Sequence, residues 1–265
     1  RQLRSGDPTA VWVPNAEQEA MRDPTRTRDD FKAREQKTRQ QLDAFVLRHG
    51  HHWPSNKTRW TQAHYDWLES LTFRHAWLRI VLQEYIDAVK IVGARVATIT
   101  DRMMKVLPQW SLAPLLDSLI ALRRIDKISA MVLLGELGDI SRFDSPKQLM
   151  AYLGLTPSEH GSGKRRRQGA VTLTGNSRAR RTLVESAWSY RFRARKTMHL
   201  KHKEVDASEE AKAVAWKARK RLFARYYSLT RAGKNTKLVC VAITRELAGF
   251  IWNIVRQEMP KLAVH

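Results

Sequence analysis

The sequence predicts a mainly α protein, with a long antiparallel coiled-coil arm followed by a compact helical domain that carries a small β-hairpin. Three observations predict this fold. Apolar residues recur in steps of three and four between residues 78 and 106. Shorter segments after residue 110 keep helical spacing and begin at residues that favour helix starts. Five of the twelve glycines fall within residues 154–175, where helical spacing stops and turns are expected.

The first elements are an extended piece and a polar helix. Residues 11–14 read as a short strand-like segment without a nearby partner. Asp23 is a good N-cap and Pro24 suits a first helical position, so a helix is expected over residues 24–48. The histidines of the linker 49–57 lack accompanying carboxylates, which favours a solvated turn over a metal site.

The next helix carries the most regular apolar pattern in the chain. The pattern comprises Leu78, Leu82, Tyr85, Val89, Val92, Val96, Ile99, Met103 and Val106. A helix of this length measures roughly 43 Å, too long for one small globule to cover. Residues 24–48 are expected to fold back along it, and a homo-oligomer is predicted through the 78–106 heptads. An ordinary core helix is the alternative, because Gly93 weakens the seam.

Helices fill most of the remaining chain. They are expected over residues 115–124, 129–137, 145–153, 177–196, 207–227 and 237–255. Basic residues on the faces of the later helices predict a groove-lining surface: Arg178, Arg181, Arg191, Arg195, Lys212, Arg219 and Lys220. The apolar run 238–255 is interrupted by Arg245 and Glu246, so a buried helix is expected there and no membrane partner.

The charge of the chain predicts a polyanionic partner, with nucleic acid as the leading candidate. Lys and Arg number 48 against 26 Asp and Glu, a formal charge of +22. The excess is concentrated in residues 161–235, which hold 21 Lys or Arg and 5 Asp or Glu. The single cysteine, Cys240, excludes an internal disulfide and a zinc site built on several thiolates, and it suits a reducing cytoplasm.

The glycine-rich segment 154–181 places serines among cations, an arrangement suited to holding a phosphodiester beside a hydroxyl. The candidate serine is Ser162, with Ser158 as the fallback. The candidate phosphate-binding residues are Lys164, Arg165, Arg166, Arg167, Arg178, Arg180 and Arg181. Two plainer interpretations remain open: a serine that only satisfies turn backbone, and cations that make nonspecific phosphate contacts. No Gly-x-Ser-x-Gly elbow occurs, which argues against a serine hydrolase.

A resemblance sharpens this prediction. Residues 140–164, Gly175-Asn176-Ser177 and Arg180-Arg181 resemble the C-terminal domain of the DEDD-type insertion-sequence transposases. These are bacterial recombinases, some guided by a bridge RNA. Further similar motifs occur at residues 6–14, 47–50, 60–64 and 245–252, so the similarity spans nearly the whole chain.

The resemblance implies a domain plan. An N-terminal RuvC-like domain holds magnesium through four acidic residues, and a coiled-coil arm links it to the serine-bearing domain. This chain is expected to begin just after the last of those acids, so it binds no metal itself, takes magnesium from the missing domain and is inactive alone. The implied parts are 1–22, the tail of the RuvC-like domain; 23–107, the coiled-coil linker and dimerisation arm; 108–258, the C-terminal serine and DNA-binding domain; and 259–265, a tail.

The resemblance also implies the chemistry. The nucleophilic serine of the family maps onto Ser162. The protein is expected to be a DNA transposase that makes a transient phosphoserine link to DNA during strand exchange, in the bacterial cytoplasm at the nucleoid. One departure is the turn 125–128, which resembles a helix-hairpin-helix but lacks glycine. Because Asp126 would repel a phosphate, this turn is expected to serve mainly packing.

Two other functions remain open. The first is a non-catalytic module that dimerises and binds DNA or a guide RNA. The second is a coiled-coil scaffold whose basic surface binds structured RNA. Trapping of a covalent protein–DNA adduct would separate both from the transposase, whereas the salt dependence of binding would not.

Overall fold

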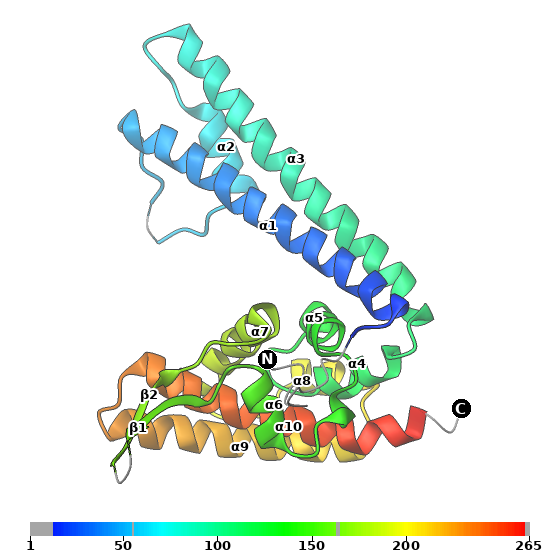
Figure 1. Ribbon diagram of the computed structural model, residues 1–265. Helices are drawn as coiled ribbons and strands as arrows, with labels where there is room; N and C mark the ends of the chain where they lie inside the picture. Colours follow the sequence, from blue (N-terminus) through cyan, green and yellow to red (C-terminus); the bar gives the residue numbers. More distant parts are fainter. Residues whose placement is uncertain (1–12, 55, 163–164, 263–265) are drawn as a thin grey trace, which may run out of the picture. The chain divides into compact units, whose positions relative to one another are not determined.

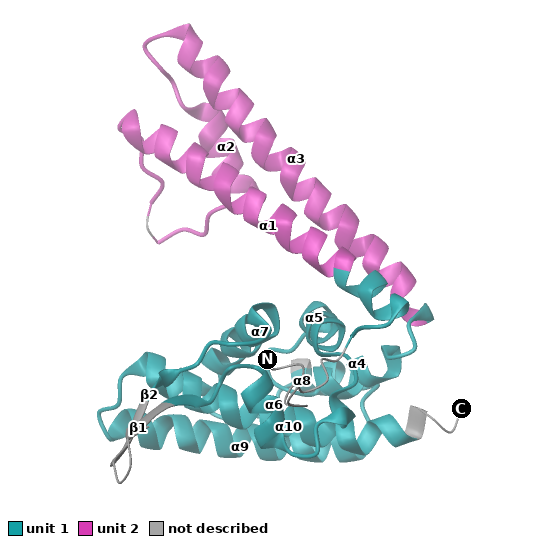
Figure 2. Cartoon of the chain, viewed as in Figure 1, with its two compact units in different colours: residues 1–22, 109–265 teal, residues 23–108 magenta. Residues whose placement is uncertain are grey.

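The computed structural model describes residues 13–54, 56–162 and 165–262, which form two compact units (Figure 2). One unit comprises residues 23–108, and the other joins residues up to Arg22 with those from Gln109 onward. Over the described residues the chain is mainly helical, with one two-stranded antiparallel sheet (Figure 1). The predicted fold class is therefore confirmed.

Three helices build the 23–108 unit: α1 (Ala16–Arg48), α2 (Gln62–Ser70) and α3 (Ala76–Val106), followed by the 3-10 turn η2 (Leu107–Gln109). The predicted start of α1 at residue 24 is wrong, because the helix begins at Ala16 and contains Pro24. Asn15 accepts a hydrogen bond from the backbone N–H of Gln18 at 2.8 Å and so takes the capping role predicted for Asp23. Helix α2 was not predicted.

Helices α1 and α3 pack antiparallel, as predicted (Figure 2). Arg28, in the first half of α1, donates to the Thr100 hydroxyl near the end of α3 at 2.8 Å. At the opposite end, the apolar core of the unit joins α1, α2, α3 and the residue after α2: Leu42, Phe45, Val46, Leu68, Leu71, Leu82, Ile86 and Val89. Of the predicted seam, Leu82, Val89, Val96 and Met103 are buried. Val106 is 55% exposed, so the seam ends one position earlier than predicted.

The linker after α1 is a packing element. The imidazole of His49 lies 4.7 Å from the Phe45 ring, and that of His51 lies 5.2 Å from the Phe73 ring, measured between centroids. Both histidines lie at a turn and are half-buried, so they are less solvated than expected. In α2, His64 is fully buried and stacks on Trp67, and this burial lowers the pKa of His64.

The other unit is organised around α10 (Thr236–Leu262), which packs against α9 (Glu209–Arg231), α7 (Ser177–Ala187), α6 (Pro146–Tyr152) and α4 (Ala113–Ile120) (Figure 1). The remaining helices of the unit are α5 (Lys127–Leu137), α8 (Met198–Lys203), η3 (Ile140–Arg142) and η4 (Trp188–Arg191). Within the described part of the chain, one stretch, Thr236–Pro260, is long and apolar enough to cross a membrane. Its contacts with four helices instead explain it as the core helix of this unit.

Two boundaries in this unit differ from the prediction. The helix expected over residues 177–196 ends at Ala187 and tightens into η4. This change of pitch buries Tyr190 completely and leaves Phe192 54% exposed. Helix α10 continues to Leu262, past residue 259 where the tail was expected to begin.

Candidate functional site

The candidate serine Ser162 lies near the tip of the hairpin formed by β1 (Pro157–Ser162) and β2 (Arg165–Val171). The antiparallel register pairs Ser162 with Arg165, Gly161 with Arg166 and His160 with Arg167. Lys164 lies outside the described residues, as do the side chains of residues 159–168. What the structure establishes is therefore backbone position: the serine and three predicted arginines occupy adjoining rungs at one end of the hairpin.

The fallback serine lies at the opposite end of the same strand. Ser158 falls in the irregularity of register between Pro157 and Glu159, and it is half-buried. A bulge of this kind redirects side chains locally. The two serines are therefore separated by the length of β1, which makes them useful as matched variants.

The base of the hairpin is formed by two backbone segments that cross at Gly154 and Gly175. Both glycines have positive φ, +63° and +75°. A Cβ on Gly154 would lie 2.1 Å from the carbonyl oxygen of Thr174, and one on Gly175 would lie 1.9 Å from that of Tyr152. Only glycine permits both the conformation and the close approach, so both positions at the base of the hairpin require glycine.

Arg180 links the two backbone segments at the base of the hairpin. Its NH1 donates to the carbonyl oxygens of Leu153 at 2.9 Å and Thr174 at 2.8 Å, one from each segment. The other two α7 arginines predicted to bind phosphate lie in the same helix. Arg181 pairs with Glu185 at 2.8 Å and is exposed, while Arg178 is half-buried in the first turn. Arg180 thus serves the protein backbone, a role that the sequence alone does not reveal.

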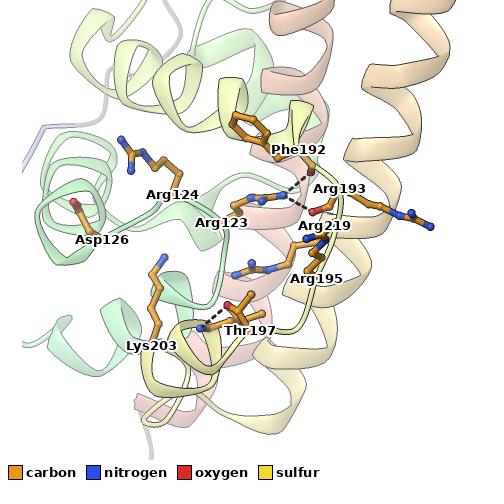
Figure 3. Close-up of a pocket in the computed structure, with 10 residues that line it drawn as sticks. Arg123, Arg124, Asp126, Phe192, Arg193, Arg195, Thr197, Lys203 and Arg219 are labelled. Atoms are coloured by element: carbon orange, nitrogen blue, oxygen red, sulfur yellow. Dashed lines mark hydrogen bonds between the residues drawn. The ribbon is translucent and has the colours of Figure 1, made fainter. Parts of the chain in front are cut away.

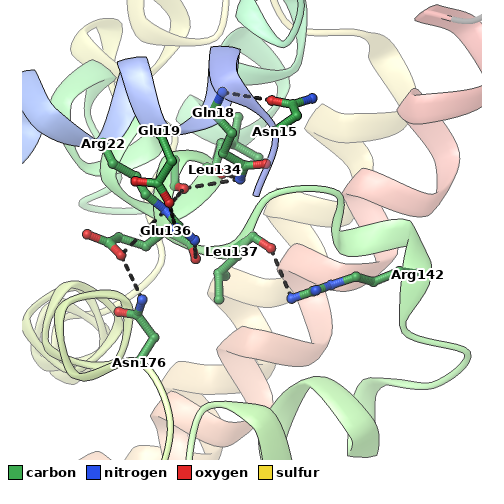
Figure 4. Close-up of polar contacts among 10 residues, drawn as sticks. Asn15, Gln18, Glu19, Arg22, Leu134, Glu136, Leu137, Arg142 and Asn176 are labelled. Atoms are coloured by element: carbon green, nitrogen blue, oxygen red, sulfur yellow. Dashed lines mark hydrogen bonds and ion pairs between the residues drawn. The ribbon is translucent and has the colours of Figure 1, made fainter. Parts of the chain in front are cut away.

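A polar network holds α7 in place (Figure 4). The buried carboxylate of Glu136 accepts from the Asn176 side-chain amide at 2.7 Å, and Asn176 in turn caps α7 by accepting from the backbone N–H of Ala179. Gln18 and Arg22 of α1 donate to the carbonyl oxygens of residues 134–136 at the C-terminal end of α5. This network orients the N-terminus of α7, which carries Arg178, Arg180 and Arg181.

The described residues do not fit a magnesium site. Nowhere among them do three or more His, Cys, Asp or Glu side chains lie together. The strand that follows Ser162 begins with three arginines, and cations oppose metal binding.

Comparison with known proteins gives a family match. Residues 117–203, which include the hairpin, match the Transposase IS116/IS110/IS902 family. A protein of Sinorhizobium fredii named "Putative transposase y4qE" is 41% identical over 257 residues, which is 97% of this chain. Over residues 117–203 this chain is therefore similar to the IS116/IS110/IS902 transposase family. The resemblance found in the sequence is thereby confirmed.

Two further relatives carry transposase names. The transposase for insertion sequence element IS1533 of Leptospira borgpetersenii is 26% identical over 181 residues, 68% of this chain and 52% of the relative. The transposase for IS1111A of Coxiella burnetii is 28% identical over 132 residues, 49% of this chain and 30% of the relative. The chain described here spans 62% of the length of the Sinorhizobium protein.

Sequence reasoning missed a second cationic feature, a cavity beside the loop between α4 and α5 (Figure 3). Arg195 and Arg219, predicted on basic helix faces, line it together with Arg123, Arg124 and Lys203. These residues come from four separate segments, and nothing in their local spacing shows that they meet.

Proposed function

We propose that this chain is the serine-bearing, DNA-binding part of a transposase, and that Ser162 forms a transient phosphoserine link to a DNA strand. The observation that supports this most directly is the register of the hairpin. Ser162 ends β1 opposite Arg165, and Arg166 and Arg167 follow on the next rungs, all within the region that matches the family.

The proposed step is an exchange of phosphate esters. The Ser162 hydroxyl oxygen bonds to phosphorus, the bond from phosphorus to one deoxyribose oxygen breaks, and the serine proton ends on that released hydroxyl. A serine hydroxyl is a weak nucleophile at neutral pH, so the charge that builds up on the phosphate must be stabilised. Arg165, Arg166 and Arg167 are the proposed source of that stabilisation. Because the number of ester bonds is conserved, the reverse step rejoins strands without ATP.

Arg180 has a different proposed role in this scheme. Its two hydrogen bonds to the hairpin base make it a positioning residue that holds the serine strand against α7. Arg178 and Arg181 remain the proposed phosphate-binding residues of that helix. Magnesium, which the resemblance implies, is proposed to be held by a RuvC-like domain outside these residues, so the chain alone would bind DNA without joining strands.

The oligomeric partner is proposed to be a second copy, but not through the predicted heptads, because Leu82, Val89, Val96 and Met103 of that seam are buried within the chain. Helix α3 exposes Trp77 (78%), Ile80 (54%) and Ile91 (61%), although the opposite side of the helix is buried against α1. Apolar side chains exposed at this level mark association surfaces.

A guide RNA, used by some recombinases that the sequence resembles, would be revealed by an RNA requirement for recombination.

The decisive experiment traps the adduct. The intact transposase is incubated with DNA whose scissile phosphate carries a bridging sulfur at the leaving position, because the released thiol rejoins poorly. A protein–DNA adduct should appear on a denaturing gel for wild type and for Ser158→Ala, and should be absent for Ser162→Ala. All three proteins should bind the DNA equally.

Each other outcome is informative. An adduct lost only in Ser158→Ala would move the nucleophile to the base of the hairpin and overturn the assignment of Ser162. An adduct formed by both variants would overturn the assignment of either serine. DNA binding without any adduct in wild type would favour the non-catalytic binding module.

A further inference from the structure

The cavity beside the α4–α5 loop gathers positive charge from distant parts of the chain. It measures about 630 Å³ and is lined by Arg123, Arg124, Asp126, Phe192, Arg193, Arg195, Thr197, Leu200, Lys203 and Arg219. Six of these residues are basic and one is acidic. The carboxylate of Asp126 caps α5 by accepting from the backbone N–H of Ser129 at 2.8 Å. Asp126 was expected to repel a phosphate, but the six basic residues that line the cavity outnumber it.

Arg219 is the buried cation of this cavity. It is 6% exposed, and its NH2 donates to the carbonyl oxygen of Ala121 at 3.0 Å and faces Glu204 at 3.5 Å. Its Nε has no hydrogen-bond partner among the residues that the structure describes. A buried donor without an acceptor costs free energy, and a bound anion would supply the acceptor.

Lys203 is a second cation of the cavity whose charged form is disfavoured by its surroundings. Its ammonium donates to the carbonyl oxygen of Leu122 at 3.0 Å. Burial, with Arg219 and Arg124 nearby, lowers the pKa of Lys203 to about 8, although Asp126 and Glu204 oppose that change. Cations forced together in this way stabilise a negatively charged ligand more than they stabilise the protein without it.

The rim of the cavity carries an aromatic ring. Phe192 is 54% exposed, and the guanidinium of Arg191 lies 4.7 Å from its ring centroid. The main-chain carbonyl of Phe192 accepts from Arg123 at 2.6 Å, which fixes this segment against the α4–α5 loop (Figure 3). An exposed aromatic ring beside cations is the arrangement that binds unpaired nucleotides, because the base stacks while the phosphate is neutralised.

We infer that this cavity binds one unpaired nucleotide of a nucleic-acid strand, with the phosphate against Lys203 and Arg219 and the base against Phe192. The inference rests on the proposed function in that the strand belongs to the nucleic acid on which the transposase acts. In this inference the cavity binds the strand, whereas the hairpin carries the proposed covalent step. Asp126, from the turn 125–128 that was expected to serve mainly packing, lines this site together with Arg123 and Arg124.

The test measures the affinity of the 265-residue chain for a short fluorescein-labelled single strand by fluorescence anisotropy. Phe192→Ala is compared with Tyr227→Ala, since both aromatic rings are exposed and Tyr227 lies outside the cavity. Arg124→Gln/Arg195→Gln is compared with Arg225→Gln/Arg231→Gln, which removes the same charge from exposed positions elsewhere on this unit. Thermal melting of each variant checks folding.

We expect each cavity variant to bind about tenfold more weakly and each control to stay within about threefold of wild type. Equal losses in cavity and control variants would overturn the inference. So would tight displacement of the strand by inorganic phosphate or a mononucleotide, which would mark a pocket for small phosphates. A duplex that competes as well as the single strand would overturn the unpaired state.

This test separates the inference from the proposed chemistry. Binding needs no covalent step and can be measured on Ser162→Ala, so failure to trap an adduct leaves the cavity assignment intact. Absence of strand binding by wild type at low salt would instead remove both proposals.

Discussion

Arg180 and Lys203 carry the same charge in different surroundings. Arg180 donates to two carbonyl oxygens of the hairpin base, so its charge serves the fold. Lys203 is half-buried, and this burial, followed by Arg219 and Arg124, lowers its pKa against the opposing effect of Asp126 and Glu204. The sequence predicted Arg180 as a phosphate-binding residue and assigned no role to Lys203. Only their neighbours in the structure distinguish a structural arginine from a lysine whose charge is unfavourable in the folded protein.

Replacing Lys203 by Met should stabilise the folded protein at neutral pH. Because the folded pKa of about 8 lies below the ordinary value of 10.5, the unfolded chain binds more protons between these values. The destabilisation in wild type is therefore complete below about pH 8 and disappears toward about pH 10.5. Allowing for solvent screening, the variant should gain about 1–2 kcal/mol in the free energy of unfolding at neutral pH and little near pH 10.5.

Urea denaturation at the two pH values measures this, with the exposed Lys201→Met as control. A gain that is equal at both pH values would contradict the assignment, since it would come from apolar packing.

The hairpin and α1 show how single elements depend on contacts made elsewhere. The sequence indicated that the glycines within residues 154–175 form turns. In the structure, Gly154 and Gly175 allow close approach of backbone to backbone at the hairpin base. Similarly, α1 extends to Ala16 because Gln18 and Arg22 bind the end of α5. In both elements the deciding partner is distant in sequence.

Gly175→Ala should disrupt the hairpin base. The added Cβ would clash with the carbonyl oxygen of Tyr152, and φ of +75° is already unfavourable for alanine. We expect a loss of about 2–4 kcal/mol in the free energy of unfolding. Gly233→Ala is the control, because φ is +69° there but a Cβ would meet no atom within 4 Å. Its loss should be about 1 kcal/mol.

Chemical denaturation measures the free energy of unfolding of both variants. Gly175→Ala reports the steric clash together with the backbone strain, and Gly233→Ala reports the backbone strain alone. Equal losses would show that the crossing at the hairpin base does not stabilise the fold.

At the scale of the whole molecule, an apolar surface and a positive net charge coexist. Helix α3 leaves Trp77, Ile80 and Ile91 exposed, and the formal charge is +22. Net repulsion opposes association, so a dimer would need this apolar surface to be buried and the charge to be neutralised by nucleic acid or salt.

Ile80→Lys/Ile91→Lys should convert the protein from dimer to monomer, because two charges would be buried in the proposed interface. Sedimentation velocity at moderate salt measures the change in mass. Leu238→Lys, a similarly exposed apolar position on α10, should leave the dimer intact. A monomeric wild type, or dissociation by the control alone, would contradict association through α3.

The sequence by itself determined the features that depend on neighbours close along the chain. Periodic apolar residues predicted the antiparallel pair α1 and α3 and the buried helix α10, and ordered motifs predicted the transposase family. Clustered glycines, arginines and serines predicted the hairpin and its candidate residues, although the role of Ser162 remains a prediction.

Only the tertiary structure decided which distant groups meet. The start of α1, the fastening of the hairpin base by Arg180 and the cavity around Arg219 all depend on residues separated by tens of positions. Helical and strand spacing describe which face of an element is apolar, but they do not describe which face of another element it contacts. For that reason the basic residues on the faces of the later helices were predictable from the sequence. The cavity that brings some of them together, and the burial of Arg219 with its Nε lacking a hydrogen-bond partner among the described residues, were not.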